Sequence, residues 1–145
     1  MSDMVPSKHA PLDLTSFNNA IRQLEDGLTD ASADTKNQLM RDGVIQRFEY
    51  TYELGHKMLK RFLEETEASS QTIDAMSFPD LIRTASERGL LLRGWDKWAE
   101  YRRARGTTSH TYDAKKAAEV FSVIPEFLED VRYLRNEITK RQQQG

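Results

Sequence analysis

Apolar side chains recur along this chain at the three- and four-residue spacing of amphipathic α-helices. The first such run starts near Asp13 or Thr15, two residues suited to capping a helix, and ends by about Ser32. Its apolar stripe consists of Phe17, Ile21, Leu24 and Leu28. No alternating pattern typical of a strand and no internal repeat competes with it. The first run therefore predicts a helix with one buried face.

A longer helix is predicted from about Lys36 to Glu67. Its main apolar face consists of Ile45, Phe48, Tyr52, Leu59, Phe62 and Leu63. A neighbouring stripe consists of Tyr50, Leu54 and Met58. Because the two stripes cover more than half of the circumference, this helix either lies centrally in a bundle or contacts a partner subunit through the second stripe. We expect the second stripe to form a dimer interface.

Two shorter helices are expected in the middle of the chain. A polar break over residues 68–75 precedes Ser77, which is a suitable N-cap, and Gly89 stands where a C-terminal cap glycine is expected. The next helix is predicted from about Trp95 to Arg105, and Gly106 should end it. Both helices are shorter than the two that precede them.

The last helix is predicted from an N-cap at Asp113 to about Lys140, with apolar residues at near-heptad spacing. Pro125 lies well inside this run. We expect it to kink the helix rather than end it, because the apolar period resumes in phase beyond it. The fold class predicted by the whole pattern is all-α, an up-and-down antiparallel bundle of four to five helices that is homodimeric.

Length and composition bound the domain organisation. A chain of 145 residues with 38% hydrophobic residues suits one globular domain with a single modest core. We expect this helical domain over residues 13–140, a disordered lead-in over residues 1–12 and a frayed tail over residues 141–145.

Overall charge and cysteine content exclude several classes of function. The 21 Lys and Arg residues nearly balance the 23 Asp and Glu residues, so any anion site must be local. The absence of cysteine excludes disulfides, thiolate-bound zinc, iron–sulfur clusters and thiol nucleophiles. No apolar run is long enough to span a membrane. We expect a soluble, cytoplasmic protein with no membrane contact, no cofactor and no metal.

Charge is unevenly distributed between segments. Residues 13–35 contain five acids and one base, whereas residues 93–105 contain five bases, among them Arg102, and two acids. The basic patch ends directly before residues 106–113, which read Gly-Thr-Thr-Ser-His-Thr-Tyr-Asp. Candidate chemistry is therefore concentrated where the patch meets this turn.

Three residues around this turn suit phosphate chemistry. Arg105 offers a planar fork of donors, His110 offers an imidazole that suits a general acid or base, and Tyr112 offers a phenol. Thr108 and Ser109 add hydroxyl groups. For Arg105 and His110 to reach one ligand, the helix must break between them. The alternative is that the arginine is solvated and the hydroxyl groups only cap the final helix.

Other polar residues have structural interpretations. Glu49 and Glu53 lie one helical turn apart on the same side as Lys57 and Lys60, which predicts ordinary surface salt bridges. His56, on the border of the apolar face, is interpreted as a packing residue.

The spacing Arg105, four residues, His110, one residue, Tyr112 resembles the R-x4-H-x-Y signature of HEPN domains (higher eukaryotes and prokaryotes nucleotide-binding). With the block over residues 42–54 and the block over residues 108–113, the chain resembles the subfamily of nucleotidyltransferase substrate-binding proteins. The resemblance extends from about Phe17 to Leu134. It departs from the family pattern at Gly106, where relatives usually have a polar residue, and at His56, where many have tryptophan.

This resemblance implies a homodimeric helical bundle that pairs with a separately encoded minimal nucleotidyltransferase, often as a toxin–antitoxin pair. It further implies a metal-independent RNase in which Arg105 stabilises the phosphorane and His110 moves the proton. Tyr112 would accept AMP from the nucleotidyltransferase. A nucleotide or RNA would bind locally, with Arg102, Thr108 and Ser109 as further contacts. The alternative is a non-catalytic interaction and dimerisation module in which the Arg-His-Tyr segment is structural.

Overall fold

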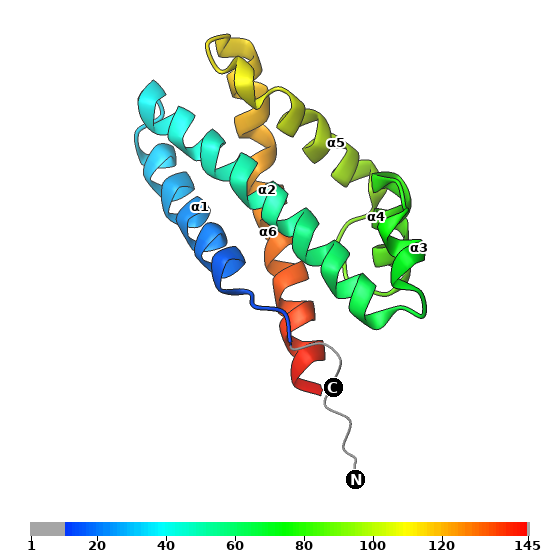
Figure 1. Cartoon of the computed structure of the whole chain (residues 1–145). Helices are drawn as coiled ribbons and strands as arrows, with labels where there is room; N and C mark the ends of the chain where they lie inside the picture. Colours follow the sequence, from blue (N-terminus) through cyan, green and yellow to red (C-terminus); the bar gives the residue numbers. More distant parts are fainter. Residues whose placement is uncertain (1–10, 145) are drawn as a thin grey trace.

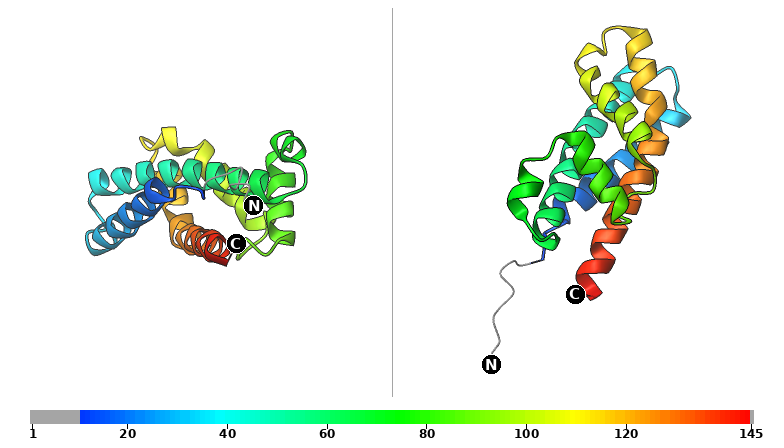
Figure 2. Two further views of the ribbon diagram at one scale, coloured as in Figure 1. Left: turned by 60° about the horizontal axis from the view of Figure 1, so that its bottom comes forward. Right: turned by 90° about the vertical axis from the view of Figure 1, so that its right-hand side faces the viewer.

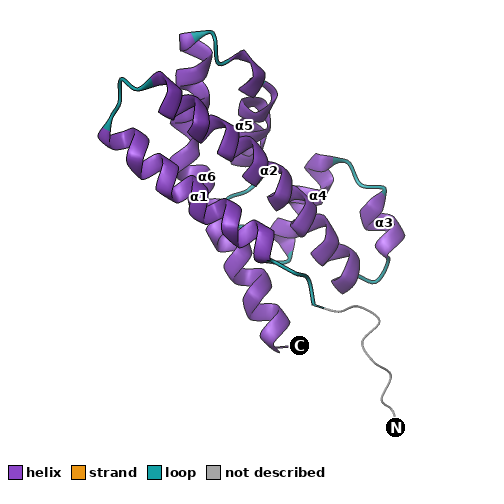
Figure 3. Cartoon of the chain, turned by 60° about the vertical axis from the view of Figure 1, so that its left-hand side comes forward, coloured by secondary structure: helices purple, strands orange, loops and turns teal. Residues whose placement is uncertain are grey.

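The computed structural model describes residues 11–144, which contain six α-helices and one 3-10 helix joined by turns and loops (Figure 1). These elements are α1 (Thr15–Ala33), α2 (Gln38–Thr66), α3 (Ser70–Asp74), α4 (Phe78–Glu87), α5 (Trp95–Gly106), η1 (Thr108–His110) and α6 (Ala114–Gln144). No strand occurs among these residues (Figure 3). The predicted all-α fold is confirmed.

The four longer helices α1, α2, α5 and α6 run alternately up and down (Figure 1). Helices α1, α2 and α6 pack against one another, and α5 packs on α2 and α6. The short helices α3 and α4 stand between α2 and α5 in the sequence; α3 packs on α2, and α4 packs on α2 and α5. Within residues 11–144, no helix is long and apolar enough to cross a lipid bilayer.

A cluster of aromatic rings joins α2, α5 and α6 in the core. The Phe127 ring lies edge-on to Phe48 at a centroid distance of 4.8 Å and to Tyr101 at 5.3 Å. Trp98 contacts the same ring at 6.2 Å. All four side chains are almost fully buried, so this cluster fixes α5 against the other two helices.

The predicted caps form as expected at three helix ends. The Ser77 hydroxyl accepts a bond of 3.3 Å from the Asp80 amide at the start of α4. Asp113 accepts a bond of 3.0 Å from the Lys115 amide at the start of α6. Gly89 has a φ of 75°, a conformation that glycine adopts at little cost. Helix α3 was not predicted, since its five residues lie in the polar break.

The two ends of the described chain contact each other. Helix α6 continues through Pro125 and reaches Gln144, so residues 141–144 are helical in place of the expected frayed tail. The Leu12 amide donates a bond of 2.6 Å to the side chain of Gln142. Leu12 also packs on the core and therefore does not belong to the expected lead-in. Residues 1–10 of that lead-in lie outside the described residues.

Candidate functional site

Residues 106–113 connect α5 to α6 at the end of the bundle opposite the C-terminus (Figure 2). Helix α5 ends at Gly106 and the separate 3-10 turn η1 follows, so the predicted helix break between Arg105 and His110 is present. A side chain at position 106 would meet no atom within 4 Å of its Cβ. The glycine therefore leaves open space beside the turn.

Two carboxylates of α2 hold the Arg105 side chain. Its Nε donates to Glu53 Oε2 at 2.8 Å, and its Nη2 pairs with the same oxygen. Its Nη1 lies 3.1 Å from Glu49 Oε2. The hydrogen bond with Glu53 and the charges of both carboxylates raise the pKa of Arg105, whose side chain is 34% exposed. The guanidinium is thus charged and already engaged.

Thr108 joins η1 to this cluster. Its Oγ1 lies 2.6 Å from Glu49 Oε2 and 2.9 Å from the Arg105 carbonyl oxygen, and its single hydrogen can go to one of them. Thr108 is buried, whereas the neighbouring Ser109 is exposed. The predicted site hydroxyl of Thr108 therefore links three elements within the chain.

His110 and Tyr112 form a second contact at the same turn. The His110 Nδ1 lies 3.2 Å from the Tyr112 Oη, and the two rings meet edge to face. Tyr112 is 83% exposed and His110 is half-buried. The structure brings these two residues together, while Arg105 makes its polar contacts with Glu49, Glu53 and Thr108. The Tyr112 phenol beside the His110 imidazole is therefore more accessible to solvent than the Arg105 guanidinium.

The basic patch predicted over residues 93–105 is largely compensated by acids from other helices. Arg93 pairs with Glu129 at 2.6 Å, and Lys97 pairs with Glu126 at 3.0 Å. These partners lie on α6, about 30 residues further along the chain, so their proximity could not be read from local charge counts. Arg105 is compensated in the same way by α2.

Arg102 and Arg103 form no ion pair with the acids of residues 11–144. Both side chains are exposed. The Arg102 guanidinium carbon lies 5.3 Å from the centre of the Phe78 ring. Within the described part of the chain, Arg102 is therefore a cation that no carboxylate neutralises, and its role as a phosphate contact stays a prediction.

The salt bridges predicted for Glu49 and Glu53 have different partners in the structure. Both carboxylates face Arg105 on α5. Lys60, one of the two lysines expected to pair with them, instead lies 2.9 Å from Asp74. Local helical spacing therefore named the wrong partner, because α5 packs against this face of α2.

The stripe predicted as a dimer interface is divided by burial. Tyr50 is 54% exposed and Leu54 is half-buried, but Met58 is only 6% exposed and belongs to the core of the same chain. Helices α3 and α4 pack on α2, a contact that the residue spacing could not reveal. Met58 is therefore removed from the expected interface, which keeps Tyr50 and Leu54.

His56 packs edge-on against Phe78 at a centroid distance of 4.7 Å, which confirms its interpretation as a packing residue. Burial, with smaller contributions from Lys60 and Arg102, lowers the pKa of His56. Among residues 11–144, no group of three or more His, Asp or Glu side chains is placed to hold a metal ion.

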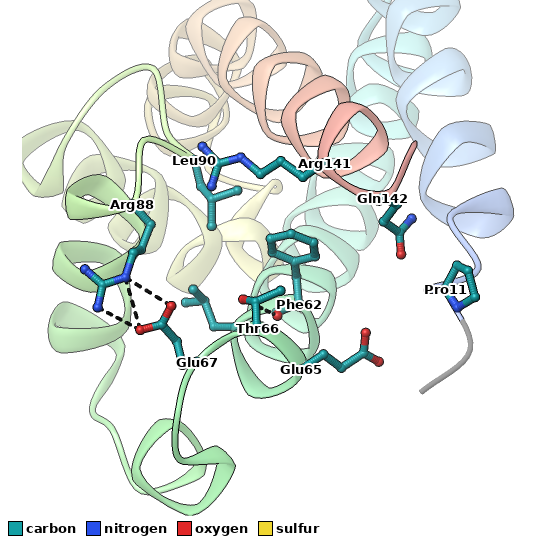
Figure 4. A pocket seen from close by; sticks show the side chains of 10 residues that line it. Pro11, Phe62, Glu65, Thr66, Glu67, Arg88, Leu90, Arg141 and Gln142 are labelled. Atoms are coloured by element: carbon teal, nitrogen blue, oxygen red, sulfur yellow. Dashed lines mark hydrogen bonds and ion pairs between the residues drawn. The ribbon is translucent and has the colours of Figure 1, made fainter. Parts of the chain in front are cut away.

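A pocket of about 480 Å³ lies far from this turn, between the C-terminal ends of α2 and α6 (Figure 4). Its apolar wall includes Phe62 and Leu90. Two of its charged groups are paired with each other, since Arg88 forms a two-pronged bond with Glu67. Neither His110 nor any other residue of the predicted site lines this pocket.

A family model described as nucleotidyltransferase substrate binding protein like matches residues 12–140. The chain is 41% identical over 101 residues to the Haemophilus influenzae protein named "Probable ribonuclease HepT", which covers 70% of this chain and 68% of that protein.

Two solved structures share the fold. One, from Haemophilus influenzae, is described as the fold of a substrate binding domain of a nucleotidyltransferase. It aligns with a TM-score of 0.82 and 33% identity over 88% of this chain and 99% of its own. A crystal structure from Thermus thermophilus aligns with a TM-score of 0.66 and 27% identity over 84% and 98% of the two chains. The family match includes the turn with Arg105, His110 and Tyr112.

Proposed function

Because this chain belongs to the HEPN-type family of nucleotidyltransferase substrate-binding proteins, we propose that it is the partner of a separate nucleotidyltransferase and offers Tyr112 as the acceptor of a nucleotidyl group. One observation carries this proposal. Tyr112 is 83% exposed, and its hydroxyl lies 3.2 Å from the His110 Nδ1. A phenol so placed is accessible to a second protein and has a proton acceptor at hydrogen-bond distance.

The transfer needs only groups that the pair and its nucleotide supply. The Tyr112 oxygen attacks the α-phosphorus of ATP, which forms a phenolic phosphodiester to AMP and releases pyrophosphate. His110 takes the phenolic proton through Nδ1, the atom that faces the hydroxyl. The exposed Ser109 of η1 and Arg102, one helical turn before the end of α5, would be further contacts for the nucleotide phosphates.

Mass spectrometry after incubation with the nucleotidyltransferase and ATP tests this proposal. We expect a mass gain of one AMP group, and we expect Tyr112→Phe to abolish it. Tyr133→Phe is the matched control, because Tyr133 is a partly exposed tyrosine of α6 that lies outside this turn and outside the α2 stripe. A mass gain that survives Tyr112→Phe would remove Tyr112 as the acceptor.

A second activity, metal-independent cleavage of RNA, is favoured by Arg105 and His110 on the two sides of the helix break. In this reaction the ribose 2′-hydroxyl attacks the adjacent phosphorus, a cyclic phosphate forms and the 5′-oxygen leaves. His110 would move the proton and Arg105 would stabilise the charge of the phosphorane. Cleavage of single-stranded RNA in the presence of EDTA, lost in His110→Ala, is the expected result.

With both activities, this protein would be the toxin and the nucleotidyltransferase the antitoxin of a toxin–antitoxin pair. An AMP group on Tyr112 would stand directly beside the His110 ring and would block access of RNA to it. The nucleotidyltransferase would thereby silence the RNase. If the wild-type protein fails to cleave RNA in EDTA, the role as a toxin is refuted. The proposed role as the partner of a nucleotidyltransferase then remains.

We also propose that the chain forms a homodimer through the exposed part of the α2 stripe. Tyr50 is a large exposed aromatic residue, and Leu54 follows it one helical turn later. Sedimentation at micromolar concentration should show a dimer, and the double variant Tyr50→Asp with Leu54→Asp should be a monomer. A monomeric wild-type protein would count against this interface.

A further inference from the structure

The ion pairs of Arg105 with α2 bring two negative charges to one positive charge. Glu49 and Glu53 lie one helical turn apart, so their carboxylates reach the same guanidinium from one face of α2. All three side chains are partly exposed, between 34% and 55%. The cluster therefore lies where a ligand from solvent can reach it, but its net charge is negative.

The donors of Arg105 show what a phosphate must displace. A guanidinium has five N–H groups, and an edge with two parallel N–H groups binds two oxygens of a phosphate. The edge formed by Nε and Nη2 is occupied by Glu53, at 2.8 Å from Nε. Nη1 contacts Glu49 at 3.1 Å and the Thr108 hydroxyl at 3.5 Å. The two-pronged edge of Nε and Nη2 therefore cannot take a phosphate until Glu53 withdraws.

We propose that Glu49 and Glu53 control the access of RNA phosphates to Arg105, and that Glu53 is the group that a phosphate displaces. This inference rests on the proposed RNA cleavage, because it takes Arg105 as the phosphate-binding residue. Glu53 is the more exposed of the two carboxylates and holds the two-pronged edge. Glu49 is also tied to Thr108, so it is less free to move.

Binding of an RNA that cannot be cleaved tests the inference without depending on catalysis. The probe is a fluorescein-labelled single strand of 2′-O-methyl RNA, and the readout is fluorescence anisotropy. Because exposed ion pairs are weak, we expect Glu53→Gln to bind this RNA about two- to fivefold tighter than the wild type. Circular dichroism verifies that the variant keeps its helical content.

A charge control separates this effect from general attraction of RNA. Glu119→Gln removes one negative charge from an exposed glutamate that lines the same surface pocket as Thr107, and Glu119 pairs with no cation of residues 11–144. This control should show a smaller gain than Glu53→Gln. Equal gains in the two variants would overturn the inference, because the effect would then be a matter of net charge.

A double-mutant cycle shows whether the gain runs through Arg105. In an Arg105→Gln background, Glu53→Gln should bind RNA no tighter than Glu119→Gln does in the same background. A gain that persists without Arg105, or wild-type binding as tight as that of Glu53→Gln, would overturn the inference. Cleavage of unmodified single-stranded RNA in EDTA is measured separately on the wild type, so its presence or absence distinguishes failure of the proposed RNA cleavage from failure of the proposed control by Glu53.

Discussion

Replacement of Asp130 by alanine should lower the free energy of unfolding by about 3 kcal/mol. Asp130 is a fully buried carboxylate in α6. It accepts hydrogen bonds from the Tyr101 hydroxyl and from the Arg93 amide, the latter at 3.2 Å. The Arg93 guanidinium adds an ion pair at 3.1 Å. Burial raises the pKa of Asp130, and these donors act in the opposite direction.

The magnitude follows from what each donor loses. The Tyr101 hydroxyl, on a side chain that is 1% exposed, would be left without a partner, which costs about 1–3 kcal/mol. Arg93 would lose a charge-assisted bond worth about 1.5–3 kcal/mol, but it keeps Glu129 at 2.6 Å. Removal of the buried charge of Asp130 offsets part of this sum.

Urea unfolding followed by circular dichroism measures the loss, at one protein concentration because association would add to the stability. Tyr101→Phe is the partner variant. In that background no hydroxyl is orphaned, so Asp130→Ala should cost about 1–2 kcal/mol less than in the wild type. The hydrogen bond from Tyr101 to Asp130 also holds α5, the helix that contains Arg105, against α6.

Two results would refute this reasoning. A loss below about 1 kcal/mol for Asp130→Ala would mean that the network contributes no more than an exposed pair. A loss that is equal in the wild type and in Tyr101→Phe would mean that the two side chains are not energetically coupled.

Three further predictions concern single residues. Because the pKa of His56 is lowered by burial from its ordinary value of 6.5, the unfolded chain binds more protons below that pH. The free energy of unfolding should therefore fall as the pH falls through 6.5. Urea unfolding at pH 7.5 and 5.5 should show a smaller fall for His56→Gln than for the wild type. An equal fall in the two proteins would contradict this. Gly89→Ala should lower the free energy of unfolding by about 1–2 kcal/mol because of its φ of 75°, and an unchanged urea midpoint would show that the loop relaxes. Ser77→Ala should cost about 1 kcal/mol in the same assay by removing the bond to the Asp80 amide, whereas Ser86→Ala, at an exposed position of α4, should cost less.

Helix positions could be predicted closely because their causes are local. The caps at Ser77 and Asp113 and the positive φ of Gly89 depend on residues within a few positions of each other. Helix α3 could not be predicted, and the reason lies in its own short sequence. Its five residues are too few to show an apolar period, although Ser69 caps it through a bond of 3.2 Å to the Thr72 amide.

The candidate site could be located but not assembled from the sequence. Residue types and spacing identified Arg105, His110 and Tyr112, and the helix break at Gly106 was predicted from the glycine. The contact between His110 and Tyr112 spans two residues and lies within reach of such an argument. The ion pairs of Arg105 could not be predicted in this way, since the two carboxylates come from positions more than 50 residues earlier.

By itself, the sequence determined the all-α class, the helix boundaries near caps and the turn that carries the candidate chemistry, because these depend on periodicity and short-range hydrogen bonds. Only the tertiary structure decided which charges meet. In the folded chain Arg105 pairs with Glu49 and Glu53, and Met58 lies in the core while Tyr50 is exposed. The physical reason is that ion pairing and burial depend on which helix faces pack together, and one charge count is compatible with many such packings.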